Sequence, residues 1–319
     1  AGDVPLGTQG NLFGITGGEG TGKSNYVAAI VAGCICPAGA DIDTLGIQIT
    51  ANGRHKAVLL YDTEQSEVQL FKNVSNLLAR AKQPDKPDEL KAFCLTGMSR
   101  KERLNAIVQS MDKFYYQYGG IQLVVIDGIA DLVKSANDEA ESVAVIDELY
   151  RLAGIYNTCI LCVLHFVPNG LKLRGHLGSE LQRKAATILS IEKDEEPTQS
   201  VVKALKVRDG SPLDVPLMLF AWDKEAGMHV YKGEKPREEK EKRKERELVN
   251  VARDIFGRQT RITYIDLCEQ LQQVLDIKER TAKSYIRFMR ERDIITKDTA
   301  NQSCFVIGSY HLQRNASCP

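Results

Sequence analysis

The chain has 319 residues, 43% of them hydrophobic and 26% charged, and its 42 basic side chains balance 42 acidic ones. This length fits one large and one small domain. No stretch approaches the roughly 18 uninterrupted apolar residues of a membrane-spanning helix, and residues 1–7 have neither the basic segment nor the apolar core of a signal peptide. We therefore expect a cytoplasmic protein, and the absence of an initial Met leaves open a start further upstream.

Short apolar runs alternate with helical stretches between Leu12 and about Ala186. Each run is almost continuously apolar, as expected for parallel strands that are buried on both faces. A repeated order of strand, helix and strand predicts a layered α/β domain. The predicted strands are 12–15, 57–62, 92–95, 122–127 and 159–165, and the predicted helices are 23–32, 66–81, 99–116 and 142–156.

Two further parts complete this domain, which we expect to cover residues 1–233. The Pro, Gly and Asn residues of segment 34–56 predict an added loop or hairpin. Whether that segment packs against the domain or closes over a ligand is left open. After Ala186, four runs joined by turns predict antiparallel strands at one edge of the sheet, and they are 187–194, 201–207, 217–222 and 228–231.

The remainder of the chain differs in composition. Residues 234–247 (EKPREEKEKRKERE) are almost purely charged and predict a solvated helix or linker between the domains, with a direct binding role as the alternative. From Glu234 onward, 18 Lys and Arg face 14 Asp and Glu, so this part is the more basic one, which mildly favours a role with nucleic acid. Three groups with helical spacing and two β-rich runs then predict a winged helix-turn-helix domain over 248–319. The groups are Leu248/Ala252/Ile255, Leu267/Leu271/Val274 and Ala282/Ile286/Met289, and the runs begin at Ile294 and Phe305.

A phosphate-binding loop is predicted at residues 17–24, where GGEGTGKS fits G-x-x-x-x-G-K-[ST] between a strand and a helix. Glycines let backbone N–H groups surround phosphates, and the helix N-terminus adds its dipole. We expect Lys23 to reach the β- and γ-phosphates of ATP, and the Ser24 hydroxyl to hold Mg²⁺. The predicted nucleotide-binding residues are Gly17, Gly18, Glu19, Gly20, Thr21, Gly22, Lys23 and Ser24.

Two carboxylates follow predicted strands of the same sheet. Asp127 ends the apolar run that begins at Gln122, which is the Walker B form, and would hold the metal beside Ser24. An Asp in this place otherwise caps a helix. Glu64 closely follows the strand that ends at Asp62 and could polarise a water molecule, although it could equally be a residue that starts a helix.

The phosphate-binding loop, the Asp62-Thr-Glu64 strand end and Val124-Val-Ile-Asp127, in this order, resemble the RecA/DnaB-type ATPases. Within them, the chain is most similar to the RepA-like hexameric helicases of plasmids and mobile elements, over residues 5–232. The resemblance implies a RecA-like fold, ATP with Mg²⁺, and a homo-oligomer that forms a hexamer. It also implies that Glu64 is the catalytic base. His165, at the end of the strand that follows Asp127 in the sequence, would sense the γ-phosphate.

The resemblance also implies contacts with DNA. The family places the loop after this strand, here residues 166–178, in a central pore that grips single-stranded DNA. Glycine and basic residues suit a mobile loop that binds phosphates. The alternative is an ordinary surface loop. The candidate DNA-binding residues of this loop are Asn169, Lys172 and Arg174.

A further likeness concerns contacts between subunits. Lys206 and Arg208, within Lys-Val-Arg-Asp-Gly, resemble the K-x-R-x-G finger with which one subunit reaches the ATP of its neighbour. A spacing of two places both cations on one face of a strand, and a guanidinium beside the γ-phosphate contributes strongly to hydrolysis. Two solvent-facing charges on an edge strand are the alternative.

The third predicted helix of the tail carries a stripe of cations at Arg280, Lys283, Arg287 and Arg290. Such a stripe is typical of a recognition helix that faces phosphates and base edges, and also of a basic face used for protein contacts. The whole sequence thus predicts an ATP-driven, oligomeric DNA helicase or translocase that serves replication or transfer of a plasmid or mobile element. It would bind single-stranded DNA in the pore and duplex DNA at the winged helix. The first alternative is an ATP-switched DNA-binding regulator or partition factor. The second is a recombinase-like filament, for which an N-terminal polymerisation segment would be the distinguishing feature.

Overall fold

The computed structural model describes residues 1–165, 175–236, 240–257, 259–275, 277–299 and 301–310. The chain divides into two compact units, residues 1–235 and 236–319, and each is considered by itself. Across the described residues, no helix has both the length and the apolar character needed to cross a membrane.

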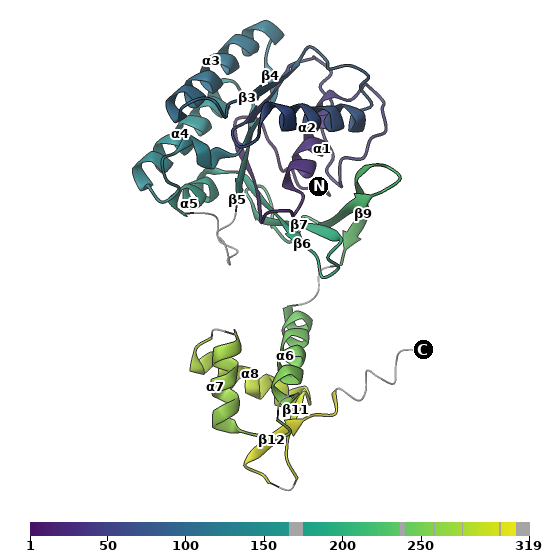
Figure 1. Ribbon diagram of the computed structural model, residues 1–319, viewed down its shortest axis with the longest axis vertical. Coiled ribbons are helices and arrows are strands. Elements are labelled where there is room, and N and C mark those ends of the chain that lie inside the picture. The colour runs from purple at the N-terminus through teal and green to yellow at the C-terminus, as the bar shows by residue number, and fades with distance from the viewer. Residues whose placement is uncertain (166–174, 237–239, 258, 276, 300, 311–319) are drawn as a thin grey trace. The chain divides into compact units, whose positions relative to one another are not determined.

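The first unit is built on a nine-stranded sheet with the order β3-β2-β4-β5-β1-β6-β7-β8-β9 (Figure 1). The strands from β3 to β6 in this order are parallel, and the last three are antiparallel additions. The predicted RecA-like α/β class, with antiparallel strands at one edge of the sheet and a small unit that follows in the sequence, is therefore confirmed. The strands are β1 Leu12–Gly17, β2 Ala57–Asp62, β3 Leu90–Cys94, β4 Ile121–Asp127, β5 Cys159–His165, β6 Thr187–Lys193, β7 Gln199–Val207, β8 Leu217–Asp223 and β9 Met228–Lys235.

Helices cover both faces of this sheet, which explains why its central strands are continuously apolar. Helices α1 (Lys23–Ile35) and α2 (Glu67–Arg80) lie on one face (Figure 1). The other face carries α3 (Arg100–Tyr118), α4 (Glu139–Ile155) and α5 (Gly175–Lys184), and a short 3₁₀ helix, η1 (Ile129–Leu132), follows β4. Each face has its own apolar core.

Helix α5 corrects the prediction of a loop over 166–178, because it begins at Gly175. Leu177 and Leu181, spaced by four residues, are buried on one side of this helix. Two apolar residues were too weak a periodic signal for a helix to be predicted.

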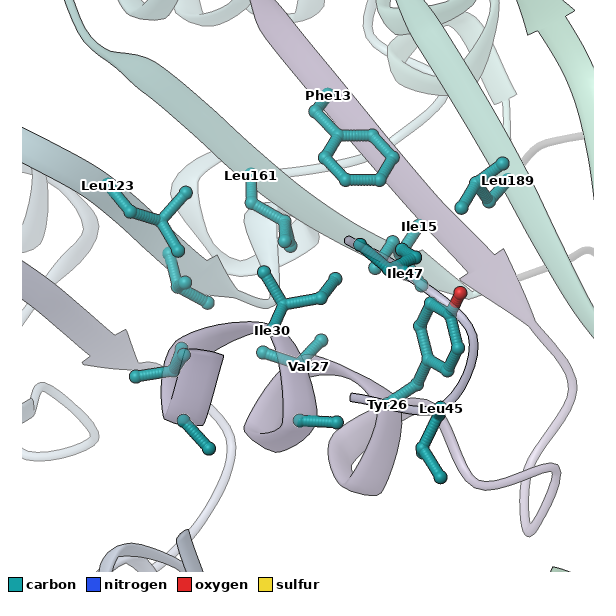
Figure 2. Close-up of a cluster of buried hydrophobic side chains, with 14 of the residues drawn as sticks. Phe13, Ile15, Tyr26, Val27, Ile30, Leu45, Ile47, Leu123, Leu161 and Leu189 are labelled. Carbon is teal, nitrogen blue, oxygen red and sulfur yellow. The ribbon is translucent and has the colours of Figure 1, made fainter. Parts of the chain in front are cut away.

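Segment 36–56, whose role the sequence left open, packs against α1. Leu45 is fully buried and Ile47 is nearly so, and both contribute to the apolar core around α1 (Figure 2). Ile49 lies so close to the helix that a Cβ atom added at Gly33 would be 2.6 Å from its Cγ1. The segment is also tied to the sheet, since an Asp43 carboxylate oxygen accepts the backbone N–H of Tyr231 at 2.7 Å.

The second unit contains three helices and a small antiparallel sheet of order β10-β12-β11. Helix α6 begins at Lys240, inside the range predicted as a charged linker, and β9 also extends into that range. A helix was one of the two structures predicted for this range, since Lys, Glu and Arg favour helix, and it continues into the buried Leu248 and Ala252. The elements are α6 Lys240–Phe256, β10 Ile262–Thr263, α7 Tyr264–Leu275, α8 Glu279–Glu291, β11 Ile295–Lys297 and β12 Cys304–Ile307.

The apolar groups predicted for this unit form its core with one exception. Val274 is 58% exposed, whereas the next residue, Leu275, packs against the core. In the last turn of helix α7, Leu275 therefore contacts the core in place of the predicted Val274. The two-residue strand β10 was not predicted, because a pair of residues carries no alternation that would reveal a strand.

If segment 36–56 is part of the core, truncating its buried leucine should destabilise the first unit. We expect Leu45→Ala to reduce the free energy of unfolding by about 2–5 kcal/mol, the usual cost of a buried leucine. Denaturant unfolding measures this change. Leu213→Ala is the matched control, since Leu213 is 70% exposed. Equal stability of the two variants would contradict a packing role for the segment.

Candidate active site

The loop between β1 and α1 surrounds the ammonium group of Lys23. Only 7% of Lys23 is exposed, and its Nζ donates to the carbonyl oxygens of Gly17 at 2.9 Å and of Gly18 at 2.6 Å. The Thr21 hydroxyl donates to the same Gly18 carbonyl at 2.9 Å. Ser24, in the first turn of α1, is exposed. The loop thus holds a cation in place and leaves a hydroxyl accessible beside it.

Two glycines of this loop are required by close packing. A Cβ atom at Gly17 would lie 2.3 Å from the carbonyl oxygen of Ile191 on β6. Gly22 has a left-handed φ of +93°, and a Cβ atom there would lie 2.8 Å from the ring of Phe220 on β8. The antiparallel strand β8 therefore packs against the loop through Phe220. No local sequence pattern indicates this contact.

Three acidic side chains lie near this loop at the carboxyl ends of the parallel strands. Asp62 and Asp127 are in register on β2 and β4, and Gly17 and His165 are in register on β1 and β5. Glu64 follows two residues after Asp62, and its Oε2 lies 3.4 Å from Nε2 of His165. The structure therefore brings the predicted Glu64, Asp127 and His165 to the same edge of the sheet as the loop.

Local hydrogen bonds fix the turn that carries Glu64. The Asp62 carboxylate, only 4% exposed as a residue, accepts the backbone N–H of Glu64 at 3.0 Å and that of Gln65 at 2.8 Å. The Thr63 hydroxyl donates to the carbonyl oxygen of Gly128 at 2.8 Å and accepts its N–H at 2.9 Å. These bonds tie the end of β2 to the end of β4.

Thr63 and Gly128 are site residues that the sequence reasoning missed. A Cβ atom at Gly128 would lie 2.6 Å from Oε1 of Glu64, so the carboxylate occupies the space that a side chain would need. The one available signal was the position of Thr63 between two carboxylates at a strand end. Its partner is 65 residues away, which explains why the pairing was not predicted.

Burial and charge act together on the ionisable groups. The pKa of Asp127 is raised to about 7, chiefly by burial and also by the nearby Asp62 and Glu64, while His165 and Lys23 oppose the shift. Burial also raises the pKa of Asp62. The pKa of Lys23 is lowered by burial, against the attraction of Asp127 and Glu64. Additional positive charge at this edge would therefore be stabilised.

The oxygen atoms at this edge of the sheet suit a metal ion that takes only some of its ligands from the protein. Within the described ranges, no three His, Cys, Asp or Glu side chains are grouped so that they could hold a metal by themselves. Mg²⁺ typically takes one or two protein groups together with substrate phosphates. The exposed Ser24 hydroxyl and the Asp127 carboxylate fit that role.

Comparison with known proteins agrees with this geometry. A family model described as AAA domain matches residues 4–169, which is just over half of the chain. The chain belongs to this family. The matched part is a P-loop ATPase domain of the RecA-like type. Comparison with curated proteins gave no match.

Among solved structures, the chain is similar to the crystal structure of the RadB recombinase. The two are 16% identical, and the match covers 70% of this chain and 91% of the other, with a TM-score of 0.44.

The structure does not bring Lys206 and Arg208 to this site. They lie at the end of β7, which pairs with the start of β6, and so at the sheet edge opposite the phosphate-binding loop. Both side chains donate to the last carbonyl groups of α5. Lys206 binds the carbonyls of Gln182 and Arg183 at 2.7 and 3.0 Å, and Arg208 binds that of Lys184 and the Asn11 side chain, both at 3.0 Å.

The predicted DNA-binding residues fall into two groups. Asn169, Lys172 and Arg174 lie outside the described residues. The four cations of the second group, Arg280, Lys283, Arg287 and Arg290, are all exposed on α8. Lys283 pairs with Glu279 at 2.7 Å, Arg287 pairs with Glu291 at 2.8 Å, and Arg290 lies over the Phe305 ring, 5.9 Å from its centroid.

The raised pKa of Asp127 predicts a pH-dependent stability in the absence of nucleotide and metal. In the unfolded chain, Asp127 titrates near its ordinary value of 3.8, whereas the folded protein retains the proton up to about pH 7. The stability of the folded state therefore falls as pH rises through this interval. Asp127→Asn removes the effect and should be more stable than the parent at pH 8, by up to roughly 4 kcal/mol.

Denaturant unfolding at several pH values tests this expectation. The extra stability of Asp127→Asn should disappear as pH falls towards about 4. In the folded state, the protonated carboxyl of the parent is then as neutral as the amide of the variant. Asp41→Asn, at an exposed carboxylate, is the control and should not show the gain. A gain that is the same at all pH values would show that the Asp127 carboxylate does not titrate in this way.

Proposed function

We propose that this protein is a RepA-like, ATP-driven DNA helicase or translocase that works as a homo-oligomeric ring of six subunits. It would serve the replication or transfer of a plasmid or mobile element. The observation that carries this proposal is the division of the catalytic groups between two edges of the sheet. Glu64, Asp127 and His165 lie beside the phosphate-binding loop, while Arg208 lies at the opposite edge.

Within one subunit, the residues of the loop would bind ATP and Mg²⁺. Lys23 would face the β- and γ-phosphates, and Ser24 and Asp127 would hold the metal, which neutralises phosphate charge. Glu64 would accept a proton from the attacking water. The turn fixed by Asp62 and Thr63 supports this role because it gives the Glu64 backbone one defined position.

His165 would report the state of the γ-phosphate. Its Nε2 lies 3.4 Å from the Glu64 carboxylate, so a change at either group reaches the other. The strand that ends at His165 continues into residues 166–174, which we propose as the segment that binds single-stranded DNA. This continuity would couple hydrolysis to movement of the DNA.

Arg208 would complete the site of a neighbouring subunit. It lies at the opposite sheet edge from the loop of its own chain, so a role in hydrolysis requires a second copy. A guanidinium that stabilises charge in the transition state is worth about 10³–10⁵ in rate. The same logic applies to Lys206, which shares its face of β7.

The second unit would bind duplex DNA and so direct the protein to its site. Three helices and a small sheet match the layout of a winged helix-turn-helix, with α8 as the recognition helix. Its exposed cations would contact phosphates of duplex DNA. In the alternative function, a DNA-binding regulator, this unit supplies the main activity and hydrolysis only times assembly.

Mixing two inactive variants tests whether the active site is shared. Lys23→Ala should lose ATP hydrolysis because the cation at the phosphates is gone. Arg208→Ala should bind ATP normally but hydrolyse it about 10³-fold more slowly. Mixed rings contain interfaces with an intact loop and an intact finger, so part of the activity should return.

Co-assembly of the two variants must be demonstrated in the same samples, for example by the mass of the complexes. If they co-assemble without recovery of ATPase activity, the shared site and the ring argument fail. Strand separation on a forked duplex then distinguishes the two functions. A regulator would hydrolyse ATP in the mixture without separating strands.

The cations of α8 should make DNA binding sensitive to salt. Arg287→Gln in the full chain should lower the slope of log K against log salt concentration by about one for the lost phosphate contact. Arg151→Gln is the matched control, because Arg151 is also an exposed arginine paired with a glutamate, here on α4 of the first unit. Equal slopes for the two variants would point to a protein-docking role for α8.

A further inference from the structure

The single tryptophan of the chain, Trp222, is 54% exposed. It lies near the end of β8. Because β6 is parallel to β1, and β7 and β8 each reverse direction, β8 runs parallel to β1. Trp222 therefore lies at the same edge of the sheet as the phosphate-binding loop, which follows β1. A half-exposed indole beside a ligand site calls for a physical explanation, since its burial would stabilise the protein.

A series of aromatic contacts links Trp222 to the loop. Phe220, two residues earlier and on the same face of β8, packs against Gly22 of the loop and lies 5.7 Å from the Tyr26 ring. His229 pairs with Trp222 across β8 and β9. Its ring is nearly perpendicular to both neighbours, 5.5 Å from Trp222 and 5.6 Å from Phe220. The indole is thus supported from the side, at a position fixed relative to the loop.

Two other aromatic rings of this series cannot receive a ligand, because Tyr26 and Phe220 are completely buried. His229 is partly buried and stands edge-on to the indole, so Trp222 presents the most exposed aromatic surface of the group. Burial, together with the nearby Arg80, lowers the pKa of His229, which keeps its ring neutral next to the indole. A neutral edge-on ring supports an aromatic platform without adding charge to it.

We propose that Trp222, supported by His229, is the surface on which the purine base of a nucleotide stacks when its phosphates occupy the loop of residues 17–24. The inference deepens the proposed function, because it rests on nucleotide binding at that loop. Stacking on an aromatic side chain is worth about 1–3 kcal/mol per base and tolerates different bases. The platform thus favours purines over the smaller pyrimidines and separates ATP from GTP only weakly.

The emission of the single tryptophan tests the proposal directly. We expect ATP with Mg²⁺ to quench the fluorescence of the full chain in a saturable manner, and CTP to do so more weakly. Inorganic tripolyphosphate is the matched ligand without a base, and it should bind without this quenching. Excitation at the red edge of the indole band limits absorption by the base itself.

Calorimetric titration of variants separates the base from the phosphates. Trp222→Leu should weaken ATP binding by about 5- to 150-fold, which corresponds to the stacking energy, and leave tripolyphosphate binding unchanged. Trp222→Phe should restore most of the affinity, because it keeps an aromatic face. Lys23→Ala should weaken both ligands, which confirms that they bind at the loop.

Two failures are distinguishable. If the parent chain binds neither ATP nor tripolyphosphate, the proposed function is wrong and the platform fails with it. If ATP binds through Lys23 while the emission and the Trp222→Leu affinity stay unchanged, the base lies elsewhere. The proposed function would then survive and the role of Trp222 would be refuted.

Discussion

The first unit depends on keeping one cation buried at the end of a parallel sheet. Removing the Lys23 ammonium from water carries a large cost, unless hydrogen bonds and opposite charges replace its hydration. The carbonyl oxygens of the loop provide the hydrogen bonds, and Asp127 and Glu64 provide the charge. In a parallel sheet, all the carboxyl ends meet at one edge, so strands that are distant in sequence can supply these groups together.

Two parts of the chain outside the parallel strands, β8 and segment 36–56, pack against the loop and α1 and hold them in place. Phe220 fills the space beside Gly22, and segment 36–56 adds Leu45 and Ile47 to the apolar core around α1 (Figure 2). The Arg80 guanidinium joins both additions, since it donates to the carbonyl oxygen of Asp43 at 2.8 Å and to that of His229 at 2.6 Å. Helix α1, and with it the loop, is therefore packed between the parallel strands and two later additions to the fold.

The sequence was informative wherever the determining interaction is local. Continuous apolar runs predicted the parallel strands, and the spacing around Lys23 predicted the loop, because both patterns lie within a few residues. Other contacts join segments that are distant in the sequence, namely Phe220 with Gly22 and Thr63 with Gly128. The sequence of either segment does not indicate which other segment it contacts. The charged run before Leu248 left helix and linker open, because such a run indicates solvent exposure but does not exclude a helix.

The contacts of Arg208 with α5 are compatible with a role in another subunit. A cation at an exposed helix C-terminus gains about 0.3–1 kcal/mol from the helix dipole, and exposed hydrogen bonds add little because water replaces them. Transition-state stabilisation of about 10³-fold corresponds to roughly 4 kcal/mol. In the transition state, exchange of the α5 carbonyls for the phosphoryl group would therefore be favourable. The same exchange would release the C-terminal end of α5, the helix whose N-terminal end follows residues 166–174.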